Sequence, residues 1–261
     1  MFMSTIVKIY TEAVRENLNP LFANWDPSKP VELGDYGVLV DDVLINIGNI
    51  RDMGINFEVR EDATPDRKSF SSEGSTEVKL NTKGAANISG AINAKATLEI
   101  NFGSKEAVFF NAAECKYSMI RDKAAIEKEV MKRYKAHQWE RNWAVVTDIV
   151  QAGATTIAIS GANNASVIFE ATGDVEKINL ADASIGLSIT NQKNVGYVID
   201  AQKGLTPLIG LSKIQSKFLW FGDKYKPLCA FYSANLLSVM RNSPSIRTEE
   251  SEDDLYFGQL K

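Results

Sequence analysis

Between Glu77 and Asn101 the side chains alternate, with few lapses, between apolar or small residues and polar residues. The even positions carry Val78, Leu80, Thr82, Gly84, Ala86, Ile88, Gly90, Ile92, Ala94, Ala96, Leu98, Ile100 and, just beyond, Phe102. Because successive strand side chains point to opposite faces of a sheet, this pattern predicts a hairpin with one apolar and one polar face. Such a hairpin can cover a soluble core, or it can turn its apolar face to a membrane and its polar face to water.

Further strands are predicted on both sides of this hairpin. The runs at 107–113 and Trp143–Val150 are apolar enough for buried strands. A second hairpin is predicted at 155–171, where Ile157 and Ile159 precede a Gly-Ala-Asn-Asn turn and Val167 and Phe169 follow it. A third pair is predicted from 183–189 and 195–199, and a last strand from 213–221 after a Leu-Thr-Pro-Leu bend. Residues 61–74 are predicted to form a solvated loop.

Helical spacing of apolar residues predicts three helices, at 5–18, 121–139 and 228–240. The expected fold class is therefore α+β, with a twisted, mainly antiparallel sheet, long hairpins and three or four flanking helices. Residues 1–244 are expected to form one domain. Residues 245–261 are expected to form a separate acidic and aromatic tail.

Composition excludes several classes of function. The chain has 261 residues, of which 44% are hydrophobic and 24% charged, so it is globular, and its net charge of -4 leaves no basic stripe for a nucleic-acid backbone. Nucleic acid is not expected as a partner. Cys115 and Cys229 lack the spacing of a zinc site, and the N-terminal residues lack the pattern of a secretory signal. No apolar run approaches the length of about 20 residues that a membrane-spanning helix needs.

The residues capable of catalysis are few and scattered. His137 is the one histidine, it lies at the end of a charged helix, and no phosphate-binding glycine loop occurs. Paired carboxylates such as Asp41 and Asp42 are adjacent in sequence and lie in turns. The chain is therefore not expected to be an enzyme, and no cofactor or metal site is predicted.

The C-terminus combines an acidic run, residues 249–254, with an apolar tip. The tip carries Leu255, Tyr256, Phe257 and Leu260. An acidic run is typical of a solvated linker, whereas a free tail has no reason to carry aromatic and aliphatic side chains together. The tip is therefore expected to dock on the rest of the protein.

The order of these elements resembles the pore-forming domain of bacterial gasdermins. The most similar parts are the buried strand Ala144-Val145-Val146-Thr147-Asp148-Ile149-Val150 and the bend at residues 204–209. Proteins of that family are held inactive by a short C-terminal tail and are cut by a partner protease. They then assemble into rings whose two hairpins per subunit enter a membrane and kill a phage-infected cell.

For this chain the resemblance implies hairpins at 76–103 and 155–171 and an autoinhibitory tail at 245–261, with Leu255, Tyr256, Phe257 and Leu260 as its apolar contacts. The residues expected to enter the membrane are Val78, Leu80, Ile92, Ala94, Ala96, Leu98, Ile100, Phe102, Ile157, Ile159, Val167 and Phe169. The implied partners are further copies of the chain, membrane lipid and an activating protease. The implied location is the cytoplasm before activation and the inner membrane afterwards.

The family commonly carries an acylated cysteine near the N-terminus, whereas this chain has no cysteine before Cys115. The apolar positions of the first hairpin also include many small residues, which suit a sheet packed closely on protein as well as one facing lipid. The alternative function is therefore a soluble α+β module that assembles with itself or with a partner and uses its hairpins as contact arms.

Overall fold

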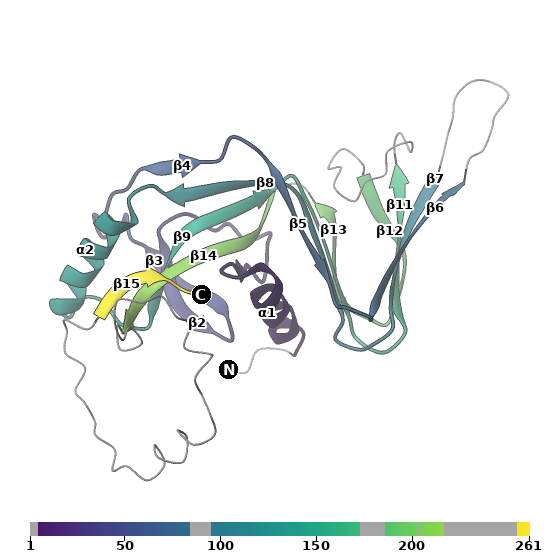
Figure 1. Ribbon diagram of the computed structural model, residues 1–261, viewed down its shortest axis with the longest axis horizontal. Helices are drawn as coiled ribbons and strands as arrows, with labels where there is room; N and C mark the ends of the chain where they lie inside the picture. Colours follow the sequence, from purple (N-terminus) through teal and green to yellow (C-terminus); the bar gives the residue numbers. More distant parts are fainter. Residues whose placement is uncertain (1–4, 84–94, 173–185, 203, 217–254) are drawn as a thin grey trace, which may run out of the picture.

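The computed structural model describes residues 5–83, 95–172, 186–202, 204–216 and 255–261 (Figure 1). Within these residues the chain forms fifteen strands and two helices, α1 (Thr5–Leu18) and α2 (Lys123–Lys135). The predicted antiparallel sheet is confirmed, but the prediction of an α+β fold with three or four flanking helices is wrong, because the described chain is mostly strand. The helix predicted at 228–240 lies outside the described residues.

The larger sheet has eleven strands. Its main path runs in the order β1 (Phe22–Ala23), β14 (Leu205–Ser216), β9 (Trp143–Ala152), β8 (Val108–Ile120), β10 (Ala154–Ser160) and β13 (Val195–Gln202). Five strands pair off this path: β2 (Asp35–Val40), β3 (Val43–Asn49), β4 (Val59–Glu61), β5 (Asp66–Ser71) and β15 (Leu255–Gln259). Every pairing in this sheet is antiparallel.

The smaller sheet has four antiparallel strands at one end of the molecule. They lie in the order β12 (Gly186–Lys193), β11 (Ala165–Thr172), β7 (Lys95–Phe102) and β6 (Thr76–Lys83). In Figure 1 this sheet and the arm formed by β5, β8, β10 and β13 meet like the two sides of a V. The strand order is the same on both sides, because β5 leads into β6, β7 into β8, β10 into β11 and β12 into β13.

Each of these four connections turns at one residue with a left-handed backbone. The residues are Gly74, Glu106, Asn164 and Asn194, with φ of 66°, 71°, 56° and 54°. Such φ values are rare for residues with a side chain, and asparagine is among those that adopt them most readily. The V is therefore one four-stranded sheet that bends sharply at these four connections. We call the four connections together the corner.

The buried apolar side chains of the described residues form three clusters. The first lies under α2 at the end farthest from the V and contains Trp139, which packs at 5.2 Å between ring centroids against both Tyr36 and Trp143. The second lies under α1 and includes Tyr10, Val14 and Phe110. The third lies inside the V. The β5–β8–β10–β13 arm is thus covered by α1 on one face and by the smaller sheet on the other.

Several predicted strand pairings are wrong. β10 pairs with β8 and β13, while β11 pairs with β7 and β12, so residues 155–171 form no hairpin. The predicted third pair fails in the same way, because β12 and β13 belong to different sheets. The turns predicted at 161–164 and 192–194 are confirmed, but there the chain passes the corner instead of reversing within one sheet.

Other boundaries also differ from the prediction. The loop predicted at 61–74 contains β5, which pairs with β8 despite its charged sequence. The helix predicted to reach Trp139 ends at Lys135, because His137 takes a left-handed φ of 56°. The last strand begins at Leu205 rather than at 213, and a register shift between Leu205 and Leu208 accommodates Pro207.

Candidate functional site

The inner face of the smaller sheet is a continuous set of apolar rows. Val78, Ile100 and Val167 are direct neighbours across β6, β7 and β11. Leu98 lies between Leu80 and Phe169 in the next row. Directly opposed residues of antiparallel strands lie on the same face. The predicted pairing is therefore confirmed over β6 and β7, whereas residues 84–94 of the alternating stretch lie outside the described residues. β11 extends the apolar face of this pair.

This face is buried against the arm, inside the V. Ile100, Val167 and Phe169 are each 0% exposed. The residues that meet them from the arm include Ala107, Phe109 and Ala158. Val78, on the edge strand β6, is the exception and is 41% exposed. The structure thus holds an amphipathic sheet whose apolar face is already covered by the same chain.

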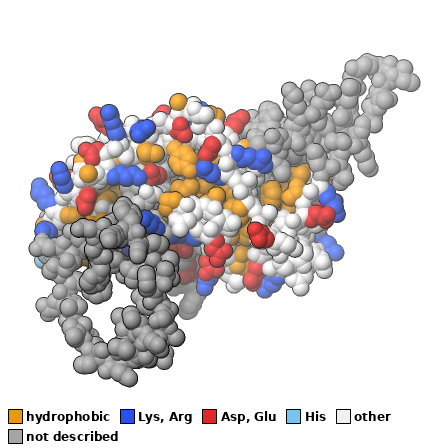
Figure 2. All heavy atoms as spheres, in the orientation of Figure 1, with side chains coloured by type: hydrophobic (Ala, Val, Ile, Leu, Met, Phe, Trp, Pro, Cys, Tyr) orange, Lys and Arg blue, Asp and Glu red, His pale blue; other side chains and the backbone are white. Residues whose placement is uncertain are grey.

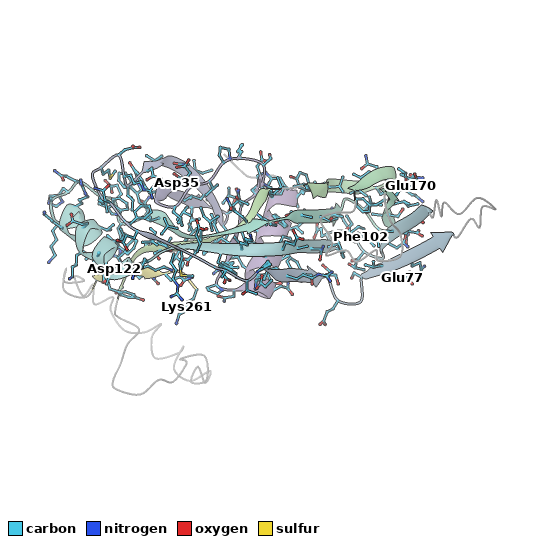
Figure 3. The ribbon with its side chains drawn as sticks, turned by 90° about the horizontal axis from the view of Figure 1, so that it is seen from above. Asp35, Glu77, Phe102, Asp122, Glu170 and Lys261 are labelled. Atoms are coloured by element: carbon cyan, nitrogen blue, oxygen red, sulfur yellow. The ribbon has the colours of Figure 1, made fainter. Side chains whose placement is uncertain are left out.

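The outer face of the smaller sheet is polar. Glu77 and Lys79 form an ion pair of 2.8 Å, and Glu99 lies opposite Lys79 on β7. Glu77 and Glu170 lie at the same end of the molecule in Figure 3, on two different strands of this sheet. Charges of both signs are interspersed on the described surface that faces the viewer in Figure 2, without a patch of one sign.

The structure separates the residues expected to enter a membrane into three groups. Val78, Leu98, Ile100, Phe102, Val167 and Phe169 share the inner face of the smaller sheet. Leu80 pairs with Leu98, and Ala96 pairs with Thr82 on one side and with Ala171 on the other. Ile92 and Ala94 lie outside the described residues.

Ile157 and Ile159 form the third group and lie elsewhere. They belong to β10 in the arm and pack in the cluster under α1. The neighbouring Ala158 points the other way, into the V. The fourth strand of the smaller sheet is β12, where Ile189 lies opposite Phe169. The alternation through Ile185, Leu187 and Ile189 predicts this strand, but the predicted pairing with 195–199 is wrong, because β12 pairs with β11.

The corner is closed by hydrogen bonds between its four connections. Gly103 N donates to Ser75 O at 2.8 Å, Ser160 Oγ donates to Ser104 O at 2.8 Å, and Gly161 N donates to Asn194 O at 2.8 Å. Each connection is therefore bonded to the next, as in a sheet. The lateral order of the strands is preserved through the bend.

The apolar tail residues dock at the opposite end of the molecule from the smaller sheet (Figure 1). β15 pairs with the outer edge of β14, and Leu255 and Phe257 are 7% and 5% exposed in the cluster under α2. Leu260 packs on the same cluster, whereas Tyr256 is half-buried. The expectation that the tip docks is confirmed, but the tip covers β14 and α2 and not the hairpins. Residues 245–254 lie outside the described residues.

The cluster under α1 holds two ionisable groups away from water. Burial, with a smaller contribution from Tyr197, raises the pKa of the Tyr10 hydroxyl, which has no hydrogen-bond partner among the described residues. Burial, followed by the nearby Asp66 carboxylate, raises the pKa of Cys115 to about 11. Both groups are neutral at ordinary pH, so this cluster is an uncharged support for the arm.

The described residues contain no group of three or more His, Cys, Asp or Glu side chains placed to hold a metal ion. Among the helices that the structure describes, none combines the length and apolar character needed to cross a membrane. Neither a scan against protein-family models nor a search of the curated proteins finds a match for this chain.

Proposed function

We propose that this protein is a latent pore former, in which the smaller sheet leaves the arm and inserts its apolar face into a membrane. The observation that carries the proposal is the composition of this sheet: two adjacent antiparallel strand pairs with one apolar face and one polar face. Strands that line a membrane pore show the same division, with apolar side chains toward lipid and polar ones toward water.

The corner supports this movement. Each strand of the smaller sheet continues into a strand of the arm in the same lateral order, so opening the V requires rotation at four connections and no change of pairing. β6 and β7 each have eight residues, close to the roughly 9–11 residues of a tilted membrane-crossing strand. Opening would expose the apolar face that the arm covers.

Self-assembly follows from the edges of the sheet. In hydrocarbon every backbone N–H and C=O group needs a partner within the protein. β6 and β12 are the two edge strands of the smaller sheet, and each has a single strand neighbour within the described chain. Insertion therefore requires that β6 of one copy pair with β12 of the next, so the proposed partners are further copies and membrane lipid.

The resemblance supplies the rest of the proposal. The C-terminal tail restrains the inactive protein in the cytoplasm, and a protease that cuts before β15 releases it to act at the inner membrane in bacterial cell death. Since β15 packs on β14 and α2, its restraint would act through the larger sheet rather than by covering the hairpins.

A soluble assembly module is the second candidate, because the apolar face, apart from Val78 on its edge, is already buried in the closed molecule. Ile100, Val167 and Phe169 need no lipid to explain them. In that case β6 and β12 would serve as edges for pairing with another copy, and the V would remain closed.

Dye release from liposomes of acidic lipid tests the proposal. A full chain with a protease site introduced near Arg247 is folded first, mixed with liposomes and then cut. Leakage is expected only after cutting. Assembly after cutting, without leakage from any variant, would favour the soluble module.

Two matched substitutions identify the surface involved. Val78→Arg places a charge on the apolar face at an exposed position, where the closed fold tolerates it, whereas Asn101→Arg places the same charge on the polar face. A basic residue facing lipid at the midplane costs about 2–4 kcal/mol per copy. We expect Val78→Arg to lower leakage strongly and Asn101→Arg to preserve it; equal leakage would contradict insertion of this face. Leu98 is unsuited to this test because it is buried in the closed form.

A further inference from the structure

The C-terminal strand β15 contacts the larger sheet through one edge. Its five residues pair with Ser212–Ser216 of β14, from Ser212 opposite Gln259 to Ser216 opposite Leu255. The pairing continues past the strand, where Leu260 N donates to Leu211 O at 2.8 Å. Within the described chain, β14 is the single strand with which β15 pairs.

The edge of β14 offers both backbone and side-chain recognition. Leu255 and Phe257 occupy alternate positions and enter the cluster that includes Ile214. The Gln215 amide donates to the carbonyl oxygens of Gly258 and Gln259 at 2.9 and 3.1 Å. An edge strand with pockets for alternate side chains is the arrangement by which proteins bind an extended peptide as an added strand.

The connection between the two strands is much longer than their pairing needs. Ser216 and Leu255 lie opposite each other, yet 38 residues separate them in sequence. Antiparallel neighbours are joined by as few as two residues. A chain of 38 residues has a maximum reach on the order of 125 Å, which is enough to bring the strand to the β14 edge of a second copy. The strand of another copy can therefore compete for the same edge.

We propose that the outer edge of β14 is an exchangeable strand-binding site, and that its occupant in assembled protein is the Leu255–Gln259 strand of a second copy. The exchanged strand makes the same five pairs and the same two apolar contacts, so no new surface is required. The proposal does not depend on membrane activity, because it concerns the opposite end of the molecule from the smaller sheet (Figure 1).

Cysteine crosslinking between full chains tests the exchange. One chain carries Gln215→Cys and a mass tag, and the other carries Tyr256→Cys; these positions are direct neighbours across β14 and β15, and both side chains are partly exposed. Both chains carry Cys229→Ser, and Cys115 is buried. After mixing and treatment with a short bis-maleimide, we expect a heterodimer in denaturing electrophoresis.

In the control, the first chain carries Glu73→Cys in place of Gln215→Cys. Glu73 is exposed and lies at the corner. We expect this pair to give at least fivefold less heterodimer than the pair across β14 and β15. A chain with both Gln215→Cys and Tyr256→Cys measures closure by its own strand. Exclusive intramolecular closure, with no more heterodimer than the control, would overturn the exchange while leaving the leakage test unaffected.

A peptide assay provides an independent measurement. Phe257→Asp in the full chain is expected to undock β15, and its far-ultraviolet circular dichroism verifies that the remaining sheet is folded. A fluorescent peptide of residues 253–261 should then bind and raise its anisotropy, and the same peptide with Phe257→Asp should bind at least tenfold more weakly. Equal binding of the two peptides would contradict a site that recognises this strand.

Discussion

At the scale of single residues, neighbouring side chains of one strand serve different cores. In β8, Phe109 faces the V and Phe110 faces α1, and in β10 the same division separates Ala158 from Ile157. The alanines at 107 and 158 are small, which allows the smaller sheet to approach the arm closely. One buried strand thus carries two unrelated sets of contacts.

Cys115 gives a pH-dependent prediction at this scale. It is 0% exposed, and burial raises its pKa from the ordinary value of 9.0 to about 11, so between these pH values the unfolded thiol ionises while the folded thiol stays protonated. Its contribution to stability is therefore complete below about pH 9 and is lost as pH rises toward 11. Cys115→Ala removes this titration.

We expect the stability difference between the parent and Cys115→Ala to shift by about 2 kcal/mol, in favour of the variant, between about pH 8 and about pH 10.5. Urea unfolding at the two pH values measures it. Comparing the two proteins cancels the contribution of Tyr10. A difference independent of pH would mean that the thiol is not held neutral by burial.

At the scale of elements, the corner connections matter most. Gly74, Glu106, Asn164 and Asn194 all take left-handed φ, one in each connection, and lateral hydrogen bonds join the connections. The local backbone therefore specifies where every strand bends. Because all four strands bend at the same corner and their connections are bonded to one another, we expect any movement of the smaller sheet to involve its four strands together.

The connection between β10 and β11 can be tested at Asn164, where φ is 56°. Asn164→Gly should leave stability within about 0.5 kcal/mol, because glycine adopts this φ without strain. Asn164→Val should lower it by about 1–2 kcal/mol, because a β-branched side chain clashes in the left-handed region. Urea unfolding of the full chain compares them; equal effects of the two substitutions would show that the connection does not require this φ.

At the scale of the whole molecule, the two ends have separate roles in the proposal. The V buries the apolar face of the smaller sheet, and the β14 edge binds the C-terminal strand. Figure 3 places Glu77 and Glu170 in one half of the molecule and Asp122 and Lys261 in the other. Any control of the V by the tail must therefore pass through the larger sheet.

Two neighbouring phenylalanines separate opening of the V from general destabilisation. Phe109→Ala and Phe110→Ala each remove a buried ring, at a cost of about 3–5 kcal/mol, but only Phe109 packs against the smaller sheet. If the V opens before insertion, the cleaved Phe109→Ala chain should leak dye faster than the parent, and Phe110→Ala should not.

Phe169→Ala serves as a third comparison, because its ring belongs to the face that would enter lipid. It should loosen the V yet fail to raise leakage, since it also removes apolar area from the inserted face. Circular dichroism verifies that each variant is folded at the assay temperature. Identical leakage rates for Phe109→Ala and Phe110→Ala would contradict a separate opening step.

Local elements whose side chains repeat with a clear period can be predicted from the amino-acid sequence alone. The alternation through Val78 and Ile100 predicted the β6–β7 hairpin and its apolar face, and the helical spacing in α1 predicted that helix with its observed bounds. The apolar tip at Leu255 and Phe257 predicted docking. Periodicity and burial are local properties of the chain, so they can be read without tertiary contacts.

Which strands are neighbours depends on long-range contacts, and these are seen only in the folded protein. Alternation is the same in a strand that reverses into a hairpin and in one that bends at a corner, so Ile157 and Val167 could not be assigned to different sheets from sequence. The charged strand β5 depends on pairing with β8, a long-range contact that its own residues do not encode. The groove that receives Phe257 likewise exists only where β14 and α2 come together.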